Sequence, residues 1–258
     1  GEELGRAWGG LLTAVREGQP DFGVAQGDGE PGLSFWDYMS LHPSKRETFD
    51  DSMRALSEYS TTSGEAAATY DFSQGGKATT VVDVGGGTGR LIASILAKFT
   101  GMRGTLFDQS EVLADAGPIL ESAGVADRCD RVAGSFFEED CIPKGADVYL
   151  MKNIIHDWGD QDSLAILQRV SEAMGEGSSS TLCILDLVKS TRVSYEPWNL
   201  DFADFFDLNM LVTVGGRERS RSEWDALLSQ AGMRITKVCR AEGVMNAGAP
   251  CVIEVKKV

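Results

Sequence analysis

Histidine is scarce in this sequence of 258 residues, in which only His42 and His156 occur. Two histidines and five widely spaced cysteines, with no CxxC pair, leave no clustered ligand set for a zinc site, so we expect no metal. The odd cysteine count also argues against a disulfide framework. This cysteine pattern is typical of a reducing compartment, and we expect a cytoplasmic protein.

Positively charged residues are also few. The 24 Lys and Arg residues face 39 Asp and Glu residues, which gives a formal net charge of −15. A nucleic-acid surface needs a basic footprint, so the composition argues against a nucleic-acid partner. Apolar runs stay well short of the roughly 18 residues that span a bilayer, and we expect no membrane association.

The order of apolar segments predicts an α/β fold. Short apolar runs, typical of buried strands, alternate with helical patterns. The expected strands cover residues 79–84, 104–108, 130–136, 146–152, 181–187, 234–239 and 250–256. Such alternation indicates a Rossmann-like, mostly parallel sheet of seven strands, covered on both faces. No helical pattern separates the last two strands, so we expect them to form an antiparallel pair at one edge.

The residues ahead of the first strand read differently. Helical spacing predicts a helix over 2–18, and two more over 34–60 with a break at Pro43. The glycine-rich stretch 18–32 reads as a loop. We therefore divide the chain into a small helical segment, 1–74, and an α/β domain, 75–258.

A glycine-rich turn follows the first strand, in "VVDVGGGTGR". Gly85, Gly87 and Gly89 let the backbone turn sharply and approach a ligand, and the following helix offers free N–H groups. The dinucleotide fingerprint GxGxxG requires glycine where Arg90 stands. The pattern DxGxGxG fits throughout, and Asp83 at its head suits a ligand with an amino group. We therefore favour S-adenosylmethionine (SAM) over a dinucleotide; a turn without a ligand is the plain alternative.

Two further positions follow predicted strands. Asp108 lies about 20 residues past the glycine turn, where an acid that binds a ribose diol is expected. It also fits a cap for the helix that starts at Ser110. His156, in "LMKNIIHDWGDQ", follows the fourth strand and carries a ring that titrates near neutral pH. It is either a general base or a core histidine.

Together these motifs resemble those of SAM-dependent small-molecule O-methyltransferases of the caffeate, acetylserotonin and bacterial polyketide type. The resemblance covers roughly residues 36–258. It runs in the family's order through "VVDVGGGTG", "GTLFDQSEV", "GSFFEED", "YLMKNIIHDWGDQDSLAIL", "LNMLVTVGGRERS" and "LLSQAGM". The "HDW" and "GGRERS" blocks are the specific ones. The resemblance implies a class I methyltransferase fold, with 75–258 as the SAM-binding catalytic domain.

The resemblance also implies a cofactor site. The glycine turn would hold the methionine part of SAM, and Asp108 the ribose. The remaining cofactor residues that it implies are Ser57, Gln109, Ser135, Phe136, Lys152 and Trp158. Ser135 stands where the family has an acid beside the adenine, so that charge is missing here. The product would be S-adenosylhomocysteine, and no metal is implied.

For catalysis, the resemblance makes His156 the general base that deprotonates a substrate hydroxyl before in-line methyl transfer. Asp186, where the family usually has Glu, and Glu218 would orient it. By their sequence context alone, Glu218 also fits a solvated loop charge and Asp186 a structural residue. The implied substrate-lining residues are Met53, Asp157, Asn209, Met210 and Thr213.

The expected function is methyl transfer to a hydroxyl, phenolic in nature, of a small aromatic or polyketide-like metabolite. Two alternatives stay open: non-methylating chemistry on a bound SAM, such as hydroxylation, decarboxylation or rearrangement, and a non-catalytic truncated partner. The family's homodimer is built by a domain ahead of this region, near whose end the sequence begins. Either the protein lacks that domain or the sequence is truncated within it, and we expect the homodimer to be weakened without it.

Overall fold

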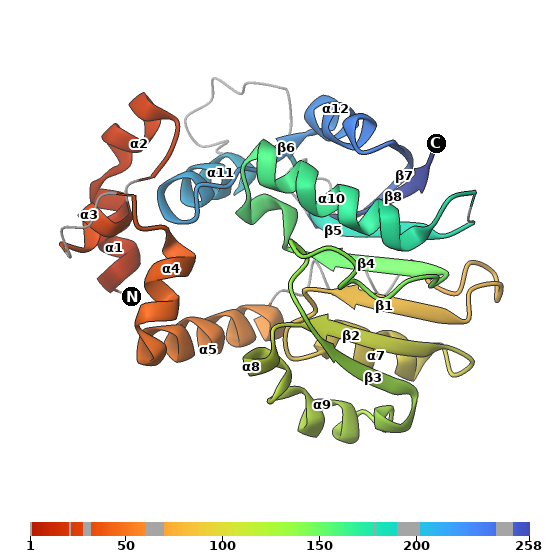
Figure 1. The fold of residues 1–258 in the computed structure, drawn as a ribbon. Coiled ribbons are helices and arrows are strands. Elements are labelled where there is room, and N and C mark those ends of the chain that lie inside the picture. The colour runs from red at the N-terminus through yellow and green to blue at the C-terminus, as the bar shows by residue number, and fades with distance from the viewer. Residues whose placement is uncertain are drawn as a thin grey trace.

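The computed structural model describes residues 2–20, 22–27, 32–59, 70–177, 179–189, 202–240 and 250–258. A twisted sheet with helices on both faces lies beside a group of N-terminal helices (Figure 1). The strands are β1 (Thr80–Val84), β2 (Arg103–Asp108), β3 (Cys129–Ala133), β4 (Val148–Lys152), β5 (Thr181–Lys189), β6 (Arg219–Ser220), β7 (Met233–Arg240) and β8 (Pro250–Lys257). Within these residues, every helix is too short or too polar to cross a membrane.

The sheet has the order β3-β2-β1-β4-β5-β8-β7, so the seven expected strands are confirmed. The expected antiparallel pair at one edge is also confirmed. Strand β8 is antiparallel to both β5 and β7, which leaves the outermost strand β7 parallel to the rest. The two-residue strand β6 was not expected; it pairs in parallel with the end of β5.

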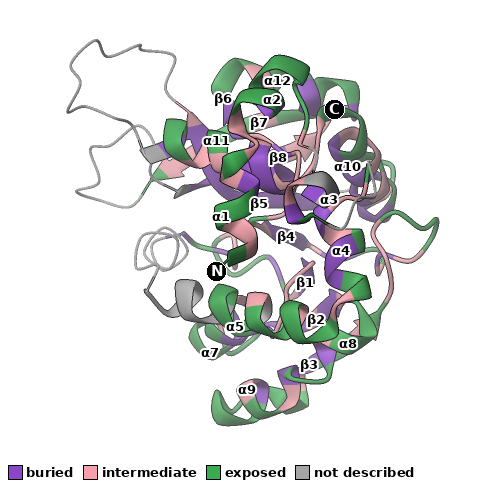
Figure 2. Ribbon diagram, turned by 90° about the vertical axis from the view of Figure 1, so that its left-hand side faces the viewer, coloured by how far each residue is buried: buried purple, intermediate pink, exposed green. Residues whose placement is uncertain are grey.

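Helices cover both faces of the sheet. They are α7 (Arg90–Lys98), α8 (Ser110–Leu113), α9 (Ala116–Ser122), α10 (Asp160–Met174), α11 (Phe202–Thr213) and α12 (Arg221–Gln230), with short 3-10 turns at Ala126–Arg128 and Ile155–Asp157. Along β1, Val82 and Val84 join the core under α10 and α12, whereas Val81 joins the core under α7 and α9. Burial on both faces explains the continuous apolar runs of the strands, which Figure 2 shows enclosed by exposed helix surfaces.

The N-terminal helices are α1 (Glu2–Gly9), α2 (Leu11–Glu17), α3 (Phe22–Gln26), α4 (Phe35–Leu41) and α5 (Pro43–Tyr59). The helix expected over 2–18 is divided at Gly10, and the loop expected over 18–32 is wrong for its middle part, which forms α3. Packing overrides the glycine-rich composition there, because the buried Phe22 ring contacts Phe35 and Tyr38 edge-on at 5.2 and 5.4 Å. Helix α11 lies between these helices and the sheet (Figure 1).

Candidate active site

The carboxyl ends of β1, β4 and β5 meet at one edge of the sheet, because these neighbouring strands run parallel. Asp83 of β1 pairs with Leu150 of β4, and Lys152, at the end of β4, pairs with Leu185 of β5. Ligands of open α/β sheets bind at this edge. The register therefore brings the glycine turn, Lys152 and Asp186 to one end of the sheet.

The turn after β1 needs glycine because its backbone is left-handed and closely packed. Gly85, Gly87 and Gly89 have φ angles of 69°, 61° and 82°, a region that favours glycine. A Cβ atom at Gly86 would lie 2.6 Å from the carboxyl carbon of Asp83. At Gly87 no heavy atom lies within 4 Å of such a Cβ position. The turn thus packs tightly on the strand at one residue and leaves its backbone accessible at the next.

Asp83 is fully buried beneath this turn. Neither of its carboxylate oxygens has a hydrogen-bond partner among the described residues. Burial raises the pKa of Asp83 to about 7, with the positive charge of Lys152 opposing that shift and the negative charge of Asp108 adding to it. Buried polar groups are normally paired. The orphaned carboxylate therefore indicates a donor or cation that a ligand would supply.

Asp108, at the end of β2, is held against the glycine turn. Its Oδ2 accepts a hydrogen bond from the backbone N–H of Gly87 at 2.7 Å, and its Oδ1 accepts one from Gln109 at 2.7 Å. Helix α8 begins without a side-chain cap hydrogen bond, so the alternative role of Asp108 as a helix cap is not seen. The carboxylate is fixed at the ligand edge of the sheet.

Three acidic side chains surround the buried His156. Its Nδ1 lies 2.9 Å from Oε1 of Glu218 and 3.2 Å from Oδ1 of Asp186, and its Nε2 lies 3.5 Å from Oδ1 of Asp157. Asp186 and Glu218 are themselves buried, at 1% and 0% exposure. One imidazole nitrogen is thus held by two carboxylates from distant segments, and the other faces a residue of its own turn. Glu218 is not the solvated loop charge that its sequence context allowed.

The charges of this cluster control the protonation of His156. Burial alone would lower its pKa, but Asp186, Glu218 and Asp157 outweigh burial and raise it well above the usual 6.5. Burial and the charge of Asp186 raise the pKa of Glu218 to about 7. Burial raises the pKa of Asp157 to about 6. The cluster can therefore exchange protons near neutral pH and above, as acid–base chemistry requires.

Comparison with known proteins agrees with this geometry. The family model described as an O-methyltransferase domain matches residues 8–234. The chain belongs to this family. The resemblance drawn from the sequence motifs, and the class I methyltransferase fold that it implied, are thereby confirmed.

Individual relatives of this methyltransferase domain come from biosynthetic enzymes. The chain is 40% identical over 252 residues to the mitomycin biosynthesis 6-O-methyltransferase of Streptomyces lavendulae, covering 98% of this chain and 65% of the relative. The solved structure of the mitomycin 7-O-methyltransferase MmcR superposes with a TM-score of 0.81 at 40% identity, over 98% of this chain and 68% of that one.

A second solved structure was determined with its ligands. The O-methyltransferase NcsB1 of neocarzinostatin biosynthesis, in complex with SAM and 2-hydroxy-5-methyl naphthoic acid, superposes with a TM-score of 0.78 at 28% identity, over 98% of this chain and 68% of that one. The chain spans 60–65% of the lengths of the first three curated relatives that it matches.

Aromatic residues of the domain gather around the turn that carries His156. The ring of Trp158 meets those of Phe137 and Phe136 edge-on, with centroids 4.8 and 6.1 Å apart. It stacks on the ring of Trp36 of α4, with centroids 6.2 Å apart. Phe136 also lies near Gly85, since a Cβ atom there would be 3.6 Å from its ring. The structure thus brings two predicted cofactor residues, Phe136 and Trp158, together with the glycine turn.

The other predicted cofactor residues are placed as follows. The Ser135 hydroxyl accepts a hydrogen bond from the backbone N–H of Phe137 at 3.2 Å, within its own turn. Lys152 is partly buried, and burial lowers its pKa while the charge of Asp83 opposes this. Ser57 lies in α5, but its side chain is outside the described residues.

The predicted substrate residues lie on three elements: the His156 turn, α5 and α11. Asp157 lies beside His156, whereas Met53, on α5, is 39% exposed. On α11, the side-chain oxygen of Asn209 accepts a hydrogen bond from Trp8 of α1 at 3.1 Å, and the Thr213 hydroxyl donates to the carbonyl of Asn209 at 2.5 Å. Met210 is buried on the same helix. The side chains of Asn209 and Thr213 are therefore hydrogen-bonded to other groups of the chain.

Three residues near the base were not predicted from the sequence. The ring of Phe206, on α11, lies 6.1 Å from that of His156. Gly216 approaches the turn so closely that a Cβ atom would lie 1.9 Å from the carbonyl oxygen of His156. Arg219 is buried and donates to the main chain on both sides of His156. For Gly216 and Arg219 the available signal was the "GGRERS" block, of which the sequence motifs assign a role to Glu218 alone.

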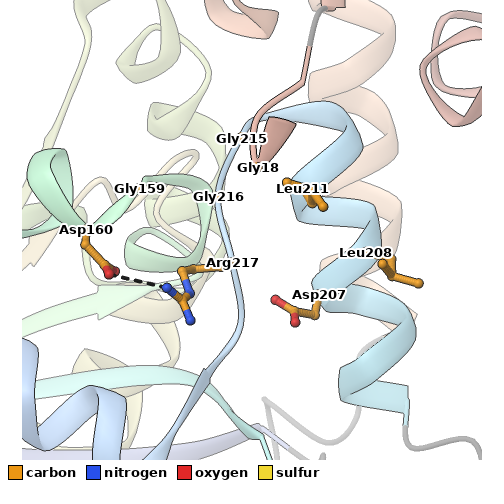
Figure 3. Close-up of a pocket in the computed structure, with 9 residues that line it drawn as sticks. All are labelled: Gly18, Gly159, Asp160, Asp207, Leu208, Leu211, Gly215, Gly216 and Arg217. Atoms are coloured by element: carbon orange, nitrogen blue, oxygen red, sulfur yellow. Dashed lines mark hydrogen bonds and ion pairs between the residues drawn. The ribbon is translucent and has the colours of Figure 1, made fainter. Parts of the chain in front are cut away.

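A cavity of about 360 Å³ lies beside the loop that contains Gly215, Gly216 and Arg217 (Figure 3). Its lining residues are Gly18, Gly159, Asp160, Asp207, Leu208, Leu211, Gly215, Gly216 and Arg217. Figure 3 shows Arg217 paired with Asp160 across its wall, at 3.3 Å. His156 and the glycine turn do not line this cavity. We therefore do not assign the acceptor to it.

Proposed function

We propose that this chain is the catalytic part of a SAM-dependent O-methyltransferase that methylates a hydroxyl of a small aromatic metabolite. The observation that carries the proposal is the cluster in which Nδ1 of His156 is held by Glu218 and Asp186 next to the glycine turn. The two parts touch, because a Cβ atom at Gly85 would lie 2.6 Å from the side chain of Ile154, two residues ahead of His156.

The residues at the sheet edge fit the methyl donor. SAM carries an ammonium group that would pair with the orphaned Asp83 carboxylate, a ribose for Asp108, and a sulfonium methyl that is the electrophile. It carries no phosphate, which agrees with a negatively charged edge formed by Asp83 and Asp108. Phe136 and Trp158 offer apolar surface for the adenine. We propose residues 75–258 as the domain that binds it, with 1–74 as a separate helical segment.

His156 supplies the proton acceptor. Its Nε2 takes the proton of the substrate hydroxyl, while its Nδ1–H donates to Glu218 and the Asp186 carboxylate lies 3.2 Å away. The two carboxylates fix the tautomer and the ring orientation, and their charge stabilises the imidazolium that forms. Deprotonation turns the hydroxyl into a strong nucleophile, and holding that oxygen in line with the methyl group supplies much of the remaining acceleration.

The acceptor is proposed to be a flat phenol. The ring of Phe206 beside His156 offers an aromatic surface on which such a substrate can stack. A naphthoic acid is the ligand in the solved NcsB1 complex. The weakened homodimer stays a prediction.

The experiment is incubation of the protein with methyl-labelled SAM and a panel of phenols and naphthols, followed by product mass. We expect a product that has gained one labelled methyl group. A product altered without that gain would support the alternative of non-methylating chemistry. Calorimetric titration with SAM separates the second alternative, because a non-catalytic remnant of the family would show no binding at millimolar SAM.

A further inference from the structure

Arg219 is a buried arginine whose three guanidinium nitrogens all donate hydrogen bonds beneath the turn that carries His156. It is 1% exposed and is one residue away from Glu218. Nη1 donates to the carbonyl oxygen of Ile155 at 3.0 Å, and Nη2 donates to that of Trp158 at 3.0 Å. The guanidinium thus binds the main chain immediately before His156 and immediately after Asp157.

The guanidinium is in turn held from its other side. Asp160 Oδ1 accepts from Nη2 at 2.7 Å and from Nε at 3.1 Å, and the Ser163 hydroxyl accepts from Nη2 at 3.0 Å. The ring of Trp224 lies against the guanidinium, 5.6 Å from its carbon. Asp160 and Ser163 belong to the first turn of α10, so the guanidinium ties the His156 turn to a long helix.

The turn itself has little regular structure to hold it. It is a single 3-10 turn, Ile155–Asp157, and Asn153 just before it has a φ of 55°, which is unusual for a residue with a side chain. The Ser163 hydroxyl donates to the carbonyl oxygens of Ile155 at 3.3 Å and Trp158 at 3.0 Å, so Arg219 and Ser163 together serve these two carbonyls. A planar guanidinium with five N–H groups in a fixed fork can serve several carbonyls at once, which lysine cannot do.

We propose that Arg219 is a positioning residue for the base. It fixes the main chain on both sides of His156, so that Nδ1 meets Glu218 and Asp186 while Nε2 stays turned toward the acceptor. Adjacent residues of one segment then have complementary roles, because Glu218 holds the imidazole and Arg219 holds the backbone that carries it. The inference deepens the proposed function and rests on His156 being the base.

The test compares Arg219→Met, Arg219→Lys and the parent by steady-state kinetics and by NMR of the imidazole nitrogens. Arg219→Met is expected to lower kcat about tenfold to hundredfold, with the KM for SAM little changed, because a small displacement of a catalytic group costs about that much. Arg219→Lys should recover part of kcat. Arg221→Met is the matched control, since Arg221 pairs with Asp225 on the surface of α12, and it should keep parental kcat.

Since the chain holds two histidines, the NMR readout is direct. Arg219→Met should shift the ring signals of His156 and their pH titration, while those of His42, whose ring packs on Tyr38 at 4.2 Å, stay in place. Parental kcat together with unchanged His156 signals would overturn the inference.

A second variant covers the case in which Arg219→Met does not fold. Asp160→Asn leaves the guanidinium in place but weakens its anchor, and Asp160 is 60% exposed, so folding should persist. It should lower kcat several-fold and shift the His156 signals in the same direction; no change in either would contradict the inference. If His156→Ala keeps parental turnover, the assignment of His156 as the base fails instead. The His156 signals of the Arg219 variants then still report whether Arg219 positions the ring.

Discussion

Glu218 Oε1 lies 2.9 Å from Nδ1 of His156, although the two residues are 62 positions apart in the chain. The short strand β6 creates this contact. Its residues pair in parallel with the end of β5, Arg219 with Val188 and Ser220 with Lys189. Asp186 lies on β5 just ahead of this pairing and Glu218 directly precedes β6, so the strand pair brings both acids to Nδ1.

The pH dependence of kcat/KM should follow the ionisation of His156. Its pKa is raised by the neighbouring acids, so the protonated ring is favoured below that raised value and the free base appears only above it. Activity is therefore expected to rise with pH through a midpoint above 6.5. Asp186→Asn removes one of the charges that raise the pKa, and should move the midpoint to lower pH.

The measurement is kcat/KM against pH for both proteins, with Asp225→Asn on the exposed face of α12 as control. A midpoint that stays fixed in Asp186→Asn, or moves equally in both variants, would contradict the assignment of the rise in kcat/KM with pH to His156.

Asp83→Asn should change stability and cofactor affinity in opposite directions. The folded-state pKa of about 7 lies above the ordinary 3.8, so the buried carboxylate destabilises the fold increasingly as pH rises between these values. Removing the charge should raise the Tm of the ligand-free protein at pH 8 and change it little at pH 4. SAM binding should weaken by about tenfold or more, as expected when a charged hydrogen bond is lost.

Thermal unfolding at the two pH values and calorimetry with SAM measure both effects. A lower Tm at pH 8 would mean that the carboxylate is satisfied within the protein. Unchanged SAM affinity would mean that Asp83 does not bind the donor.

Gly216→Ala should impair turnover by displacing the base. The new methyl group would overlap the carbonyl oxygen of His156, to which the backbone N–H of Arg217 also donates at 2.9 Å. One of these two segments must move, and kcat should fall about 100-fold or more while SAM still binds. Gly159→Ala is the matched control, because its Cβ would meet nothing closer than 4.0 Å. Equal kcat in the two variants would show that the close approach is irrelevant.

The order of strands and helices was predictable from the sequence, because strands buried on both faces are continuous apolar runs that can be recognised directly. Helix α3 was missed for the opposite reason, since Phe22 is a single anchor in a stretch rich in glycine. The division at Gly10 falls at the adjacent glycines Gly9 and Gly10, and the two helices that it separates both contact α11.

The site was predictable only in part. The resemblance named His156, Asp186 and Glu218, and the strand register shows how they meet. Arg219 was not predicted because a buried arginine and an exposed one look alike in a segment rich in charged residues. Phe206 was missed because the facing direction of α11 is set by its contacts with α1 and α2, far away in the sequence.

The most direct test of the central claim is the turnover of His156→Ala with labelled SAM and an accepted phenol, compared with His42→Ala and the parent. Loss of a general base lowers kcat by about 10²–10⁴-fold. We expect that loss in His156→Ala, with SAM affinity retained, and parental turnover in His42→Ala. Equal turnover of the two variants would contradict the role of His156 as the base.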